Sequence, residues 1–186
     1  MNLPNRLTLV RIALSFLLVL LLLSPGLAFK EAALFVFAAA ALTDWWDGRI
    51  ARRRGLVSDF GILMDPIADK VLVLFAFGAF VWLRVAPLWV VLLIAAREIL
   101  ITALRMAALS KGRALPAEAA GKWKAALQMT TIAVALLFLV ARGLFAAGWW
   151  IVRVERVLKG LIFLTLLVTL ASGLSFLRRN RKLIFG

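Results

Sequence analysis

The sequence contains no cysteine, no histidine and no tyrosine. Without cysteine, neither a disulfide nor a thiolate metal site can form. Without histidine, the commonest general base and the commonest transition-metal ligand are both missing. Any acid–base or metal chemistry must therefore be carried by carboxylates.

Acidic residues are scarce as well, since 9 Asp and Glu stand against 23 Lys and Arg, which gives a formal net charge of +14. Such an excess of positive charge is typical of proteins that meet nucleic acid or anionic lipid. Here the basic residues are dispersed over several loops, and no soluble platform for stacking bases is evident. We therefore expect membrane lipids as partners and no nucleic acid.

What the sequence has in abundance is apolar residues, which make up 65% of the 186 positions. An ordinary soluble domain is about 45–50% apolar. The apolar residues form long runs, and a bilayer core is crossed by about 20 such residues. We predict an all-α integral membrane protein, a single domain over 1–186, with six transmembrane helices around a polar active site at the cytoplasmic side. The helices are expected at 6–24, 30–53, 61–84, 87–110, 121–142 and 153–179.

The distribution of positive charge predicts the orientation of these helices. Most Lys and Arg residues fall near the chain start, the second and fourth connections and the C-terminal end, and these positions belong in the cytoplasm by the positive-inside rule. Six spans then place both termini there. The first apolar run resembles a secretory signal, but a second membrane run follows directly, so we expect the first helix to be retained.

Five of the nine acidic residues fall between Asp44 and Asp69. Asp44 and Asp47 are spaced i, i+3 and share one helix face, while Asp65 and Asp69 are spaced i, i+4 on the next helix. Four carboxylates brought together would repel one another unless a cation neutralised them. An all-oxygen ligand set suits Mg²⁺ or Mn²⁺. Two such ions about 4 Å apart clamp a diphosphate and stabilise phosphoryl transfer.

The ordinary alternative is that these acids only form ion pairs with neighbouring basic residues, namely Arg49, Arg52, Arg53 and Lys70. The small residues on the same helix faces argue for a ligand instead, because Gly48, Ala51 and Gly61 leave space for close approach to the backbone.

Residues 44–52 read DWWDGRIAR, and residues 61–69 read GILMDPIAD after an eight-residue gap. This pattern resembles the CDP-alcohol phosphotransferase motif at every defining position, and eight positions fixed over 26 residues form a specific signal. The resemblance implies six transmembrane helices and a homodimer.

The same resemblance implies roles for the motif residues. Two divalent metal ions would be bound by four carboxylates: Asp44, Asp47, Asp65 and Asp69. The CDP moiety would lie among five residues: Asp47, Gly48, Ala51, Arg52 and Gly61. Asp69 would also be the general base, which takes a proton from the acceptor hydroxyl. That hydroxyl oxygen would attack the phosphorus next to the diacylglycerol, and CMP would leave.

Three further segments resemble bacterial phosphatidylglycerophosphate synthases: residues 2–12 (NLPNRLTLVRI), 97–99 (REI) and 121–124 (GKWK). This resemblance implies glycerol 3-phosphate as acceptor, CDP-diacylglycerol as donor and a bacterial cytoplasmic membrane location. Four basic residues are candidates for binding the acceptor phosphate: Arg97, Arg105, Lys122 and Lys124.

Structural roles for these residues remain open alternatives. Glu98 and Arg105 share a helix face and could pair, and Arg97 could bond a motif aspartate across helices. Lys122 and Lys124 could instead set the membrane topology and bind anionic lipid.

Other functions also remain open. The same chemistry could act on another acceptor, such as serine, inositol phosphate or phosphatidylglycerol. A divalent-cation transporter would use the acids as its ion site, but acids crowded at one interface rather than at mid-membrane disfavour that role. A non-catalytic scaffold would keep the metal site for structure alone.

Overall fold

A computed structural model describes residues 3–54, 59–110, 112, 119–145 and 148–181. Within these ranges, the side chains of residues 3–7, 44–54, 59–67, 69 and 119 lie outside the description. The described residues form six α-helices and no strand. They are α1 (Leu3–Leu23), α2 (Leu27–Arg54), α3 (Asp59–Trp82), α4 (Leu88–Ser110), α5 (Ala119–Leu144) and α6 (Trp149–Arg179). The predicted six helices are thus confirmed as helices, with ends within about four residues of those expected.

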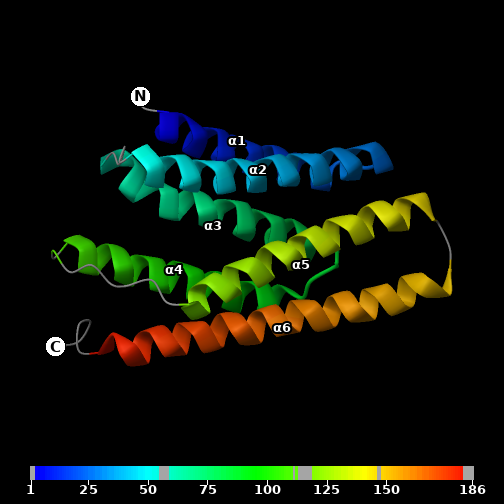
Figure 1. Cartoon of the computed structure of the whole chain (residues 1–186). Coiled ribbons are helices and arrows are strands. Elements are labelled where there is room, and N and C mark those ends of the chain that lie inside the picture. The colour runs from blue at the N-terminus through cyan, green and yellow to red at the C-terminus, as the bar shows by residue number, and fades with distance from the viewer. Residues whose placement is uncertain (1–2, 55–58, 111, 113–118, 146–147, 182–186) are drawn as a thin grey trace.

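The helices run back and forth as a bundle, and Figure 1 shows the two chain ends on the same side of it. α1 packs against α2 and α3, and α6 packs against α4 and α5. α3 contacts both α4 and α5, and α2 contacts α5, so these contacts join the two halves of the bundle. Polar side chains on α4 and α5 can therefore meet residues of α3.

The turn between α3 and α4 shows how the sequence ends a helix. Arg84 adopts a left-handed backbone conformation with φ of 58°. The amide of Val85 donates to the carbonyl of Phe80 at 2.8 Å, and the amide of Arg84 donates to that of Val81 at 3.0 Å. These two bonds form a Schellman motif, which satisfies carbonyls at the helix end. Pro87 then precedes α4, because proline suits a helix start but not its interior.

Pro66 lies inside α3, which begins at Asp59. A proline removes one backbone hydrogen bond, so its place in the sequence predicts a kink or a late helix start there. The helix does not start late, because its first turns precede Pro66 and the proline falls within one continuous helix.

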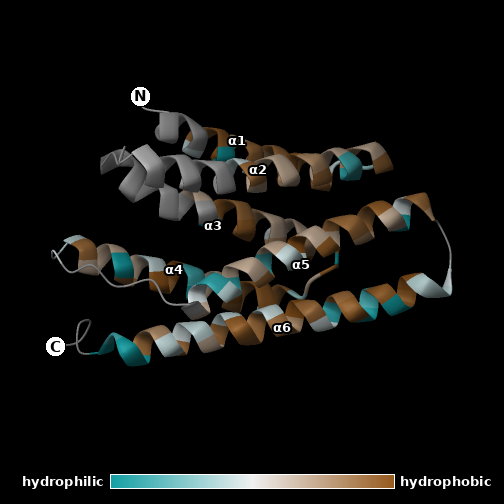
Figure 2. Ribbon diagram, in the orientation of Figure 1, coloured by the Kyte–Doolittle hydropathy of each residue, from teal (hydrophilic) through white to brown (hydrophobic). Residues whose placement is uncertain are grey.

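The interior of the bundle changes from apolar to polar along its length. Buried apolar side chains such as Leu18, Leu22, Phe77, Phe80 and Ile132 fill one part. The buried polar side chains lie from the middle toward the end at which α1 and α5 begin and α4 and α6 end. They are Thr8, Arg11, Ser15, Glu98, Lys124, Gln128, Thr131, Thr165, Thr169, Ser172 and Asn180. In Figure 2, the hydrophilic ribbon of α4 lies beside that at the start of α5.

Two helices of the described chain are long and apolar enough to cross a membrane, namely Ala120–Leu144 and Trp149–Arg179. Two shorter apolar stretches, Thr8–Leu23 and Lys70–Trp82, accompany them. Large apolar side chains such as Phe35, Trp82 and Leu167 are exposed on the outside of the bundle. An all-helical bundle with an apolar exterior and a partly polar interior suits a membrane environment.

Candidate functional site

The motif aspartates lie on two helices that follow one another in the chain. α2 runs without a break through Asp44 and Asp47, and α3 runs without a break through Asp65 and Asp69. The helical spacing expected for each pair therefore holds for the backbone. The side chains of all the motif residues (Asp44, Asp47, Gly48, Ala51, Arg52, Gly61, Asp65 and Asp69) lie outside the described residues, so their roles stay predictions.

Directly after Asp69, the chain enters a charged cluster centred on Glu98 of α4. Glu98 is only 1% exposed. Its Oε1 accepts from Lys124 Nζ at 2.5 Å, and its Oε2 lies 3.3 Å from Lys70 Nζ. Arg97 Nη1 donates to Oε1 at 3.2 Å. One buried carboxylate therefore joins cations carried by α3, α4 and α5.

Neutral polar groups extend this cluster toward α6. Gln128 donates from Nε2 to Glu98 Oε1 at 3.3 Å, and the same Nε2 lies 3.4 Å from Thr169 Oγ1. On the other side, Arg97 Nη2 donates to Ser172 Oγ at 2.8 Å. These contacts satisfy polar groups that would otherwise be costly to bury in an apolar bundle. They also fix the rotation of α4, α5 and α6 about their axes.

A polar cavity of about 130 Å³ opens onto this cluster. Its charged lining comes from Arg11, Lys70, Glu98 and Lys124, on four different helices. Among the described residues, three of these lining side chains are cationic and one is anionic, so this part of the cavity wall carries a net positive charge. Water occupies about 30 Å³ per molecule in the liquid, so the space suits a small anion rather than a nucleotide.

The four acceptor candidates fall into different places. Lys124 is 4% exposed and lines the polar cavity. Arg97 touches the same carboxylate from its own helix. Lys122, by contrast, is exposed. The guanidinium of Arg105 lies over the ring of Phe176, 5.1 Å from its centroid, and this cation–π contact replaces the pairing with Glu98 that we considered.

The possible bond from Arg97 to Asp44 or Asp65 lies outside the described residues. Three cavity residues did not figure among the predicted site residues, namely Arg11, Lys70 and Glu98. The sequence held a signal for Glu98 alone among these three, because Lys124 and Gln128 are spaced i, i+4 and share a face. That face needed an anionic partner, and Glu98 is one of few acids outside the motif.

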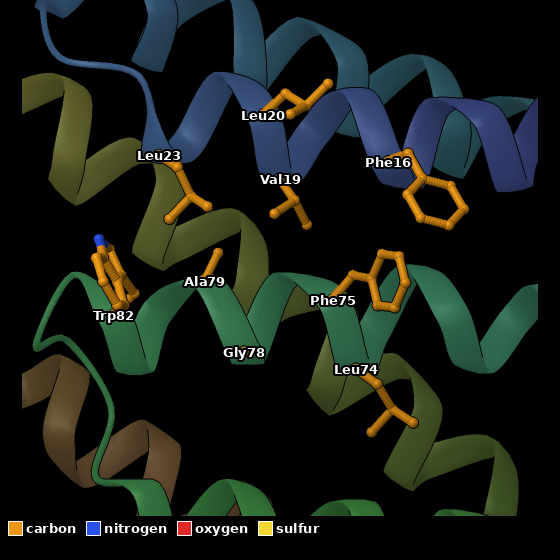
Figure 3. A pocket seen from close by; sticks show the side chains of 9 residues that line it. All are labelled: Phe16, Val19, Leu20, Leu23, Leu74, Phe75, Gly78, Ala79 and Trp82. Atoms are coloured by element: carbon orange, nitrogen blue, oxygen red, sulfur yellow. The ribbon is translucent and has the colours of Figure 1, made fainter.

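A larger cavity of about 510 Å³ lies between α1 and α3, away from the charged cluster. Figure 3 shows its lining, which comes from Phe16, Val19, Leu20, Leu23, Leu74, Phe75, Gly78, Ala79 and Trp82. The rings of Phe16 and Phe75 meet edge to face at 5.0 Å. No side chain of this lining is charged, so the cavity suits apolar groups. The charged groups that could bind polar substrates lie instead at the polar cavity and on the motif helices.

Comparison with known proteins gives a consistent result over most of the chain. Residues 1–174 match the family model described as CDP-alcohol phosphatidyltransferase. The chain is 39% identical over 185 residues to the CDP-diacylglycerol–glycerol-3-phosphate 3-phosphatidyltransferase of Escherichia coli K12, covering 97% of this chain and 95% of the relative.

Two further bacterial proteins are similar to the chain. The chain is 36% identical over 149 residues to a Bacillus subtilis protein of the same name, covering 73% of this chain and 77% of the relative. It is 38% identical over 139 residues to a probable phosphatidylglycerophosphate synthase of Mycobacterium tuberculosis H37Rv, covering 73% of this chain and 66% of the relative.

Proposed function

The chain belongs to the CDP-alcohol phosphatidyltransferase family, and we propose that it transfers a phosphatidyl group from CDP-diacylglycerol to glycerol 3-phosphate. The products are phosphatidylglycerophosphate and CMP. The names of the similar bacterial proteins support both the donor and the acceptor. The observation that carries the proposal is the placement of a cationic cavity directly beside the motif, since Lys70 of the cavity follows Asp69 in α3.

Glycerol 3-phosphate is a dianion, so its site needs cations that can donate hydrogen bonds to phosphate oxygens. Lys124 and Lys70 reach the polar cavity from two helices and suit this role. Arg97 supports them through the shared carboxylate. Lys122 is exposed, which favours contact with lipid headgroups or free acceptor at the surface. Arg105 remains a candidate because it lies about two helical turns beyond Arg97 on α4.

The four motif carboxylates form an all-oxygen donor set that fits Mg²⁺ or Mn²⁺. Divalent metal ions are general in this family. We assign Asp44, Asp47, Asp65 and Asp69 as the ligands of two ions. Bound there, the ions would neutralise the diphosphate of the donor and the CMP that departs.

The protein's own residues then position the two substrates. Gly48, Ala51 and Gly61 provide room for the CDP moiety, and Arg52 supplies a cation beside it. Asp69 takes the proton of the acceptor hydroxyl, whose oxygen forms a bond to the phosphorus that carries diacylglycerol. The bond from that phosphorus to CMP breaks, and CMP leaves with the electron pair. A carboxylate base is the reasonable choice in a chain without histidine.

We further assign all six helices as transmembrane spans of a bacterial cytoplasmic membrane, with both termini in the cytoplasm. The polar end of the bundle would then face the cytoplasm, where the acceptor is soluble. The chain ends lie at that same end (Figure 1). A homodimer is assigned from the family resemblance.

The test is CMP release by purified protein with CDP-diacylglycerol, Mg²⁺ and glycerol 3-phosphate. Release should require all three components. It should stop in Asp65→Asn, which loses a metal ligand, and in Asp69→Asn, which loses the base. Glu31→Gln, a change of the same kind near the start of α2, is the matched control and should retain activity.

Other outcomes would change the assignment. Release with serine, inositol phosphate or phosphatidylglycerol, but none with glycerol 3-phosphate, would keep the family and overturn the acceptor. Full turnover in Asp69→Asn would overturn the base. Metal flux across liposomes without CMP release would favour a cation transporter, and a folded but silent protein would favour a scaffold.

A further inference from the structure

Glu98 is the most enclosed charged side chain in the described part of the bundle, and four polar side chains converge on it. Oε1 receives Lys124, Arg97 and Gln128, and Oε2 faces Lys70. Oε1 thus receives three donors, while Oε2 is paired with the charge of Lys70 at 3.3 Å and accepts no hydrogen bond from the described residues. The partners come from α3, α4 and α5, and all but Arg97 line the 130 Å³ cavity together with Glu98.

Packing alone does not account for such an arrangement. Removing charges from water is expensive, and a well-packed set of apolar residues is often as stable as a buried ion pair or more so. Ionisable groups within membrane segments usually mark a functional site. The position of Glu98 on the wall of a cationic cavity indicates that the cluster has a function.

We propose, resting on the function proposed above, that Glu98 is a positioning residue that holds the ammonium groups of Lys70 and Lys124 apart and aimed into the cavity for an anionic acceptor. A lysine carries its charge on a flexible four-carbon stem, so an ammonium needs a partner to be fixed in one place. Glu98 provides that partner for both, with one oxygen for each lysine. The residue acts through the lysines and does not touch the acceptor.

The two lysines are suited to different parts of this task. The Lys124 side chain is 5% exposed and therefore closes the inner wall of the cavity. The Lys70 side chain is 31% exposed and stands where the acceptor would enter. Without the carboxylate, two like charges in a small space would repel, and the Lys70 ammonium would move toward water.

This proposal predicts a result opposite to that of simple charge counting. Replacing Glu98 by a neutral residue makes the cavity more positive, which by charge alone would strengthen the binding of an anion. If Glu98 positions the lysines, the same change must weaken binding, because the cations are no longer held. The sign of the change in KM therefore separates the two accounts.

The experiment measures steady-state CMP release by detergent-purified Glu98→Gln at varied glycerol 3-phosphate and, separately, at varied CDP-diacylglycerol. The KM for glycerol 3-phosphate should rise about tenfold, the size expected from losing one hydrogen bond to a charged group. The KM for CDP-diacylglycerol should stay within about twofold of wild type. Glu155→Gln also removes one carboxylate from an ion pair, with Lys159 at 2.7 Å on the surface of α6, and it should leave both constants unchanged.

Glu98→Asp covers the case in which Glu98→Gln does not fold. It keeps the charge but withdraws the carboxylate by one methylene, so the KM for glycerol 3-phosphate should rise about threefold. An unchanged or lower acceptor KM in either folded variant, with an active wild type, would overturn the inference and leave the proposed function intact. A wild-type protein that is folded but inactive with glycerol 3-phosphate would overturn the proposed function and this inference with it.

Discussion

Gly173→Ala offers a direct test of how tightly α4 and α6 hold Arg97. Gly173 is buried on α6, and a methyl group added there would lie 3.0 Å from Cγ and 3.1 Å from Nε of Arg97. Unstrained contacts between such atoms are about 3.5–4.0 Å, so Arg97 must shift by about 0.5 Å. Arg97 cannot shift freely, because Nη2 is bonded to Ser172 at 2.8 Å and Nη1 to Glu98 at 3.2 Å.

The expected free-energy change is the difference between two opposing effects. Overpacking typically costs about 1–3 kcal/mol. Alanine is preferred to glycine inside a helix by about 0.8–1 kcal/mol. The net change at Gly173 is therefore a loss of about 1 kcal/mol of stability. Gly160→Ala on the same helix is the matched control, because an added methyl group there meets no atom within 4 Å. That variant should gain up to about 1 kcal/mol.

The two variants should thus differ by about 2 kcal/mol, which corresponds to about 4–8 °C in Tm for a chain of this size. The assay is thermal unfolding of the purified variants in one detergent. In the Arg97→Ala background of a double-mutant cycle, Gly173→Ala should lose most of its destabilising effect, because the added methyl group no longer clashes with the Arg97 side chain. Equal stabilisation by Gly173→Ala and Gly160→Ala would refute the reasoning.

Three further predictions concern single contacts. Lys30→Met should lower stability by about 1 kcal/mol in thermal unfolding, because the Lys30 ammonium donates to two backbone carbonyls at the end of α1; an unchanged Tm would contradict this. Thr165→Val should cost a similar amount by the same assay, because it removes a buried hydroxyl 2.7 Å from that of Thr131. A Val variant as stable as wild type would mean that this contact contributes little. Lys159→Met should change stability by less than about 0.5 kcal/mol, because its ion pair with Glu155 is 51% and 41% exposed; a larger loss would show that the pair is more than a surface contact.

The sequence predicted the helices well because apolar runs and turn residues set them locally. α3 ends at Trp82 and α4 begins at Leu88, directly after Pro87, and the i, i+3 and i, i+4 spacings of the motif aspartates hold along α2 and α3. Local pattern could not predict which helices would lie side by side, because that depends on packing between distant segments. The pairing of Glu98 illustrates this limit. Arg105 lies on the same helix face as Glu98, yet Glu98 pairs with Lys70 of α3 and Lys124 of α5.

The same limit explains the uneven prediction of acceptor residues. Lys122 and Lys124 are two positions apart in the sequence and are indistinguishable by charge or composition. On a helix two positions correspond to about 200° of rotation, so one side chain faces the interior when the other faces outward. Lys124 is 4% exposed and bound to Glu98, whereas Lys122 is exposed. The rotation of α5 about its axis determines which of the two lysines points into the bundle.

The polarity of the bundle interior separates stability from chemistry along the helix axes. On α1 the buried positions Thr8, Arg11, Ser15, Leu18 and Leu22 repeat at intervals of three and four, and they change from polar to apolar in that order. The apolar part contributes packing, because its side chains need no partner in a low-dielectric interior. The polar part needs a fully satisfied network, since one unpaired group there is costly. Substitutions in the apolar part should therefore change Tm with little effect on the KM for the acceptor, while those around Glu98 should change both.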